Sequence, residues 1–143
     1  MLCSEEGWTF LETLIVIAVI VTLSGSVGMA GLKFVTESKR VAARTQIETY
    51  AAAINAYAMD AGRIPTEAQG LEALRRKPVL EPVPRRWNGP YVTREIADDP
   101  WGRPYEYRIP GPEGLPFALL SYGADGRPGG TKGAADVRSW SRE

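Results

Sequence analysis

Two aspartates near the C-terminal end of the chain could bind a cation. Asp125 and Asp136 flank a glycine-rich loop, residues 126–133. Calcium takes about six to eight oxygen ligands and accepts carboxylates and backbone carbonyls in flexible geometry. Two carboxylates and the carbonyls of such a loop meet this requirement, although the dense acidic pattern of an EF-hand is missing. Because Asp-Gly is also an ordinary turn signal, the residues alone leave both a calcium site and a simple turn open.

A second acidic residue, Glu12, stands at the start of an apolar run. The twenty residues 13–32 carry no charge, and about 20 apolar residues are enough to cross a bilayer as a helix. A carboxylate at the bilayer centre costs about 2.5–3.5 kcal/mol unless it is paired. Glu12 could also lie at the interface, where it would favour the positive N-terminal end of the helix. The run predicts a membrane helix and leaves both roles of Glu12 open.

Two other kinds of N-terminal segment would also be apolar. A secretory signal peptide begins with basic residues and has a core of about 7–15 residues, whereas here the run is longer and Glu5 and Glu6 precede it. A plain signal anchor conflicts with the positive-inside rule, because Lys33, Lys39 and Arg40 all follow the run. The N-terminal residues alone do not decide between these segments.

The composition restricts the remaining function classes. A chain of 143 residues can hold one anchor and one small domain. Basic and acidic residues both number 17, so no charge argument favours nucleic acid as a partner. The chain lacks histidine, which is the commonest general base, and its only cysteine is Cys3. Asp98, Asp99 and Glu106 have no companion base, so we expect them on the solvated surface and expect no enzyme.

The middle of the chain predicts a long helix followed by irregular structure. Apolar residues recur at helical spacing from residue 33 to about 61, and Gly62 provides a C-terminal stop. The members of this stripe are Ile47, Tyr50, Ala51, Ile54, Tyr57 and Ala58. Residues 66–69 form a capping box that opens a short helix through Leu71 and Leu74. Four prolines in residues 78–90 predict an irregular loop, which we expect Trp87 and Tyr91 to anchor.

The C-terminal part predicts a small sheet. Apolar and polar residues alternate in residues 104–109 and 116–122 well enough to predict two strands, which residues 111–114 would join. Residues 136–140 could form a third strand. Residues 98–102 read as a turn, because proline and glycine close the segment. We therefore predict an α+β fold, in which a long N-terminal helix packs on a small antiparallel sheet.

Several motifs resemble a known family. The start, Gly7-Trp8-Thr9-Phe10-Leu11-Glu12, is similar to the N-terminus of type IV pilins and pseudopilins. Four further motifs follow in order: Thr66-Glu67-Ala68-Gln69-Gly70-Leu71-Glu72-Ala73-Leu74, Trp87-Asn88-Gly89-Pro90-Tyr91, Asp99-Pro100-Trp101-Gly102-Arg103-Pro104-Tyr105 and Ser121-Tyr122-Gly123-Ala124-Asp125-Gly126. Together they resemble the G-type, or major, pseudopilins of type II secretion systems. Each motif alone is only turn or cap chemistry.

This resemblance implies how the N-terminus is processed. A prepilin peptidase would cut between Gly7 and Trp8 and methylate Trp8, and Glu12 of one subunit would pair with the new amine of its neighbour. The chain would then consist of a leader (residues 1–7), a transmembrane and assembly helix (8–32) and a periplasmic, pilin-like head (33–143). The acidic leader departs from the usual basic one, and Trp8 replaces the usual phenylalanine.

The resemblance also implies a function and a calcium site. Such a subunit polymerises into a periplasmic pseudopilus and helps drive folded proteins across the outer membrane, starting as a single-pass protein of the bacterial inner membrane. Its partners would be further copies, minor pseudopilins, an inner-membrane platform and the peptidase. The calcium ligands would be the side chains of Asp125 and Asp136 and the carbonyls of Tyr122 and Arg127. The alternatives are a type IV pilin and a monomeric, anchored calcium-binding protein.

Overall fold

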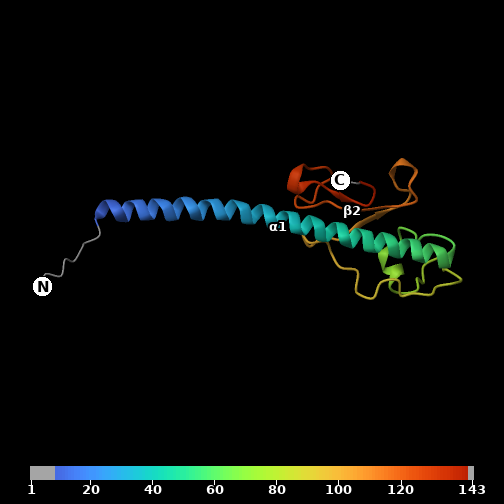
Figure 1. Ribbon diagram of the computed structural model, residues 1–143. Helices are drawn as coiled ribbons and strands as arrows, with labels where there is room; N and C mark the ends of the chain where they lie inside the picture. Colours follow the sequence, from blue (N-terminus) through green and yellow to red (C-terminus); the bar gives the residue numbers. More distant parts are fainter. Residues whose placement is uncertain (1–8, 142–143) are drawn as a thin grey trace. The chain divides into compact units, whose positions relative to one another are not determined.

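The computed structural model describes the backbone of residues 9–141 and the side chains of residues 9–24 and 34–141 (Figure 1). The chain divides into two units, Met1–Val35 and Thr36–Glu143. Helix α1 (Phe10–Ala61) contributes residues to both. The expected leader and the cleavage site between Gly7 and Trp8 lie outside the described residues.

Helix α1 begins with a threonine cap. The backbone N–H of Glu12 donates a hydrogen bond to Thr9 Oγ1 at 3.3 Å, and the N–H of Thr13 donates to the carbonyl of Thr9 at 3.2 Å. The Thr9 side chain therefore satisfies the N–H of Glu12, which has no partner within the helix, and its carbonyl accepts the first regular helical hydrogen bond. The expected membrane helix, residues 8–32, includes positions 25–33, whose side chains the structure does not describe. Within the described residues, no helix is both long and apolar enough to cross a membrane.

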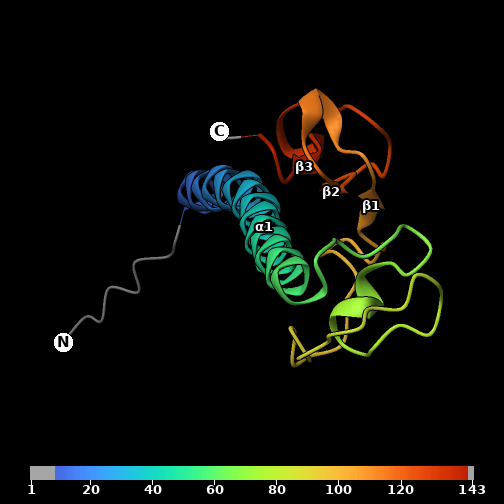
Figure 2. The ribbon, with the colours of Figure 1, turned by 90° about the vertical axis from the view of Figure 1, so that its right-hand side faces the viewer.

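The second unit packs around one face of α1. The buried helix residues Ala43, Ile47, Tyr50, Ala53, Ile54 and Tyr57 form the centre of the hydrophobic core. Figure 2 shows the three strands on one side of this part of the helix. The helix ends at Ala61, and the next residue, Gly62, takes a φ of 75° and donates its N–H to the carbonyl of Ala58 at 2.9 Å. The predicted apolar stripe and the glycine stop are confirmed.

The sheet has three antiparallel strands in the order β1-β2-β3. Strand β1 (Glu106–Arg108) pairs with β2 (Ala118–Ser121), and β2 pairs with β3 (Val137–Arg138). All four residues of the central strand β2 are buried. Each strand lies within its predicted range but is shorter. Proline has no backbone N–H to give to a ladder, and Pro104, Pro110 and Pro116 stand just outside β1 and β2.

Three short 3₁₀ helices connect these elements: η1 (Leu71–Leu74), η2 (Pro112–Gly114) and η3 (Lys132–Ala134). The capping box before η1 is confirmed, because Thr66 N–H donates to Gln69 Oε1 at 3.0 Å and Gln69 N–H donates to Thr66 Oγ1 at 3.2 Å. The box does not run straight into a helix, however. Gly70 takes a φ of 59°, which is left-handed backbone that interrupts a right-handed helix, so η1 begins only at Leu71.

The proline-rich loop is held in place as predicted. Trp87 Nε1 donates a hydrogen bond to the carbonyl of Ala73 at 3.1 Å. The Tyr91 N–H donates to the carbonyl of Leu74 at 2.8 Å, and its hydroxyl donates to Asp60 Oδ2 at 2.8 Å. Both aromatic rings pack against the hydrophobic core. The loop is therefore irregular in backbone but fixed by its aromatic residues.

Candidate functional site

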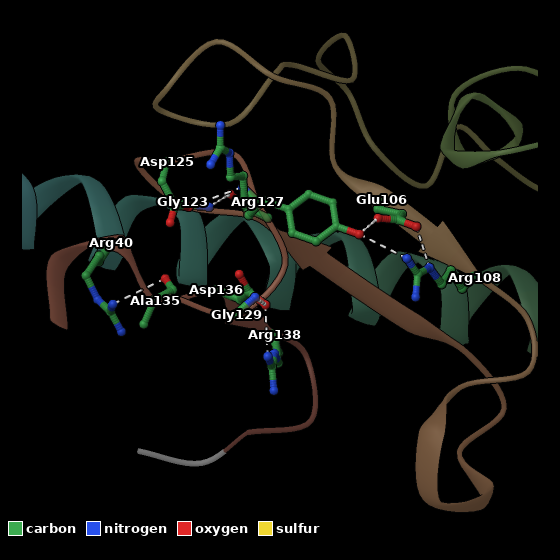
Figure 3. A network of polar contacts seen from close by, with 12 residues as sticks. Arg40, Glu106, Arg108, Gly123, Asp125, Arg127, Gly129, Ala135, Asp136 and Arg138 are labelled. Atoms are coloured by element: carbon green, nitrogen blue, oxygen red, sulfur yellow. Dashed lines mark hydrogen bonds and ion pairs between the residues drawn. The ribbon is translucent and has the colours of Figure 1, made fainter. Parts of the chain in front are cut away.

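Asp136 has one carboxylate oxygen without a partner. Its side chain is only 4% exposed. Oδ2 accepts hydrogen bonds from Gly129 N–H at 3.0 Å and from Arg138 Nη2 at 2.8 Å (Figure 3). Oδ1 is buried and has no hydrogen-bond partner among the described residues. Such an unsatisfied oxygen is costly, and a bound cation would satisfy it, so Asp136 fits the predicted role of calcium ligand.

The loop has two arms, and Asp125 lies on the first arm, whereas Asp136 lies on the second. Its side chain is exposed, and Oδ1 accepts a hydrogen bond from Arg127 N–H at 3.2 Å. A Cβ added to Gly130 would lie 2.3 Å from the carbonyl oxygen of Ala134 and 3.3 Å from Asp125 Oδ2. Only a glycine fits between these oxygens. The loop therefore brings Asp125 and the carbonyl of Ala134 to the same small region.

The other two predicted ligands contribute backbone atoms. Tyr122 follows β2, and its ring is held by β1: the hydroxyl donates to Glu106, and Arg108 Nη2 donates to the hydroxyl oxygen at 2.9 Å. The hydrogen bond to Glu106, together with burial, raises the pKa of Tyr122 above its ordinary value. Burial alone would raise the pKa of Glu106, but the bonds from Tyr122 and Arg108 outweigh it and lower that pKa. Tyr122 is thus fixed beside the loop, whereas Arg127 is exposed within it.

The donor set is poor in acidic side chains. In the part of the chain that the structure describes, no three His, Cys, Asp or Glu side chains come together. A cation in this loop would have to complete its shell with backbone carbonyls. Calcium accepts such ligands readily, so the residues present fit calcium better than a metal that prefers imidazole or thiolate.

Asp99 is buried, whereas we expected it on the solvated surface. It is only 5% exposed. Oδ1 accepts hydrogen bonds from Trp101 N–H at 3.0 Å and Arg103 N–H at 2.9 Å, and Oδ2 accepts one from the Ser121 hydroxyl. The turn itself was predicted, but its packing was not: the Asp99 carboxylate bonds the backbone two residues on and also the Ser121 hydroxyl of β2, which keeps it away from solvent. Neighbouring Asp98 is exposed, as expected.

Glu12 is the one predicted assembly residue that the structure describes, and its side chain is exposed near the start of α1. Gly7 and Trp8, the expected cleavage site, lie outside the described residues, and so does the Trp8 amine with which Glu12 of a neighbouring subunit is expected to pair. Thr9 was missed as the cap of this helix. Its sequence signal is a threonine three residues before a glutamate at the start of an apolar run, which matches a capping box.

Known proteins share both the sequence and the fold. Residues 32–140 match the family model for type II secretion system protein G. The chain is 37% identical over 136 residues to the type II secretion system core protein G of Pseudomonas aeruginosa, covering 95% of each chain. It is 35% identical over 140 residues to that of Vibrio cholerae, covering 96% of this chain and 92% of the relative.

A solved structure agrees with these relatives. The crystal structure of the major pseudopilin from the type II secretion system of enterohaemorrhagic Escherichia coli superimposes with a TM-score of 0.61 and 31% identity, covering 73% of this chain and 88% of that chain. The predicted resemblance to major pseudopilins and the pilin-like α+β fold are thereby confirmed. This chain belongs to the type II secretion system protein G family.

Proposed function

We propose that this pseudopilin polymerises through the first part of α1 into a periplasmic pseudopilus that helps drive folded proteins across the outer membrane. The observation that carries the proposal is an apolar surface on that part of the helix. Its large side chains are between 38% and 79% exposed. They are Phe10, Leu11, Leu14, Ile15, Val16, Ile17, Val19, Ile20, Val21 and Leu23. Such a surface is stable only when lipid or neighbouring subunits cover it.

Lipid would cover this apolar surface before assembly, and neighbouring subunits would cover it afterwards. Before assembly the apolar run, residues 13–32, spans the inner membrane once, with the head in the periplasm. On assembly the same surface packs against the helices of other copies. Minor pseudopilins, an inner-membrane platform and the prepilin peptidase are the further partners. The subunit itself performs no catalysis, because a cytoplasmic motor and the peptidase supply the energy and the covalent chemistry.

The intact mass of the protein extracted from native membranes tests this proposal. We expect loss of residues 1–7 and gain of one methyl group on Trp8, because assembly requires the processed N-terminus. An unchanged mass would instead indicate an anchored monomer, and a chain that begins at Gly31 would indicate a secreted protein. Either of those masses contradicts the pseudopilus proposal.

We also propose that the loop between Asp125 and Asp136 binds one calcium ion. The side chains of both aspartates and the carbonyls of Tyr122 and Arg127 would hold it. The unpaired Oδ1 of Asp136 supports this assignment, since a buried carboxylate oxygen needs a hydrogen-bond donor or a cation, and Arg138 bonds only Oδ2. The ion would tie the short strand β3 to the rest of a head too small for a large core.

Calcium should raise the melting temperature of the head, because an ion that binds only the folded state stabilises it. At a free concentration about 100-fold above Kd the gain is about 2.7 kcal/mol, or about 10–20 °C for a domain of this size. The measurement is thermal unfolding of the full-length protein in detergent, with calcium and with chelator. Asp136→Asn should abolish the difference, whereas Asp98→Asn, on an exposed residue, should keep it. Equal melting temperatures of the unmodified protein with calcium and with chelator would contradict the proposed calcium site.

A further inference from the structure

Two arginines from outside the calcium loop bond its backbone, one on each arm. The first is Arg40 of α1, which reaches the arm that carries Asp136. Its Nη1 donates hydrogen bonds to the carbonyl of Lys132 at 2.6 Å and to that of Ala135 at 3.3 Å. Figure 3 shows the guanidinium directed at Ala135, the residue immediately before Asp136. Arg40 therefore fixes the backbone from which a proposed calcium ligand projects.

The same arm rests directly on the helix. A Cβ added to Gly133 would lie 2.6 Å from Thr36 Cγ2, closer than side chains normally approach. Gly133 thus allows η3 to pack against α1 near the base of the Arg40 side chain. The carbonyls of Lys132 and Ala135 lie on either side of this contact along the chain. The arm with Asp136 is held by one packing contact and one guanidinium.

Arg103 holds the other arm, which carries Asp125. Its Nη1 donates a hydrogen bond to the carbonyl of Gly123 at 2.8 Å. A Cβ added to Gly126 would lie 2.5 Å from Arg103 Cζ, so the guanidinium lies against the loop backbone at this glycine. The backbone of Arg103 is fixed in turn, because its N–H donates to the buried carboxylate of Asp99 at 2.9 Å. Arg103 thus contacts the backbone on both sides of Asp125 along the chain, at Gly123 and at Gly126.

We propose that Arg40 and Arg103 are positioning residues for calcium: each holds one arm of the loop in place, so that Asp125 and Asp136 face the ion before it arrives. This inference rests on the proposed calcium site. A guanidinium suits the task because its planar donors bond carbonyl oxygens and keep their charge at any physiological pH. A ligand that finds its site already ordered binds more tightly, because no ordering entropy is lost on binding.

The sign of the mutational effect separates positioning from simple charge. Replacing an arginine near the ion by glutamine removes a positive charge, and electrostatic repulsion alone predicts tighter calcium binding. Loss of the hydrogen bonds to the loop carbonyls predicts weaker binding. In both Arg40 and Arg103 the guanidinium charge is partly offset by the carbonyl oxygens that it bonds. We therefore expect the weaker binding caused by a less ordered loop to exceed the tighter binding caused by the lost charge.

The test is calorimetric titration of calcium into the full-length protein in detergent. Arg40→Gln and Arg103→Gln should each weaken binding by about tenfold, the order expected for a lost charge-assisted hydrogen bond. Arg63→Gln is the matched control. Arg63 Nη2 donates to the carbonyls of Pro82 at 3.0 Å and Val83 at 3.3 Å, in the proline-rich loop, so this variant should bind calcium as the unmodified protein does. Arg40→Lys should restore part of the affinity, since an ammonium can still bond one carbonyl.

Hydrogen exchange in chelator gives an independent readout. Amides of residues 123–136 should exchange faster in Arg40→Gln and Arg103→Gln than in the unmodified protein or in Arg63→Gln. Equal or tighter calcium binding by the two variants, with normal binding by the unmodified protein, would overturn the positioning role and leave the calcium site standing. Absence of calcium binding by the unmodified protein would overturn both.

Discussion

Replacing Asp99 by alanine should destabilise the head by about 3 kcal/mol, since three hydrogen bonds to a buried carboxylate disappear together. The N–H groups of Trp101 and Arg103 and the hydroxyl of Ser121 would lose their acceptor. For a domain of this size the midpoint of thermal unfolding should fall by about 10–20 °C. The effect should extend to the loop that we propose to bind calcium, because Ser121 Oγ also accepts the N–H of Gly123 at 3.1 Å.

Two matched variants make this prediction sharp. Asp98→Ala, at the exposed neighbouring position, should change stability by less than about 0.5 kcal/mol. Asp99→Asn keeps an oxygen for the two backbone N–H groups but loses the acceptor for the Ser121 hydroxyl, so its loss should be intermediate. Urea unfolding of the full-length chain in detergent measures all three. Equal stability of Asp99→Ala and Asp98→Ala would mean that Asp99 does not organise the turn.

Glu12→Ala should leave processing intact and impair assembly of the pseudopilus. An unpaired charge at membrane depth costs about 2.5–3.5 kcal/mol, and in the proposed filament the alanine variant leaves the amine of Trp8 without its carboxylate. Filament yield should therefore fall at least about tenfold. The helix start should survive, because the Thr9 cap uses the backbone N–H of Glu12 and not its side chain.

The yield of filaments isolated from the periplasm, after the outer membrane is opened, measures assembly. The intact mass of the subunit measures processing separately. Thr13→Ala is the control, since it alters the adjacent helix position without touching the charge, and it should assemble normally. Glu12→Gln, which keeps the size of the side chain, should fail as Glu12→Ala does. Normal filaments from the glutamine variant would show that the carboxylate charge plays no part in assembly.

Local chemistry explains why most elements could be predicted. The stop at Gly62, the reciprocal bonds of Thr66 and Gln69, and the anchoring of the proline-rich loop by Trp87 and Tyr91 all depend on residues close together in the chain or on a strong apolar preference. The ends of strands and of the short helix were predicted less well. The strands β1 and β2 are shorter than predicted because proline removes ladder donors next to them. The short helix starts later than the capping box predicts because Gly70 interrupts it.

The candidate site shows the same division. Asp125 and Asp136 could be chosen from the sequence because acidic residues flanking a glycine-rich segment are a local pattern, and the family resemblance followed from the order of the motifs. The buried, unpaired Oδ1 of Asp136 could not be foreseen, since burial depends on what packs above a residue. Asp99 was misplaced for the same reason.

The sequence by itself determined the family, the long helix with its apolar start, and the two aspartates on which a calcium site would depend. Only the tertiary structure decided which distant groups support that loop. Arg40 meets the carbonyl of Lys132 across 92 residues of chain, and Arg103 meets that of Gly123 across 20. No periodicity or spacing encodes such contacts, because a long flexible side chain finds its acceptor only after the helix, the turn and the sheet have packed.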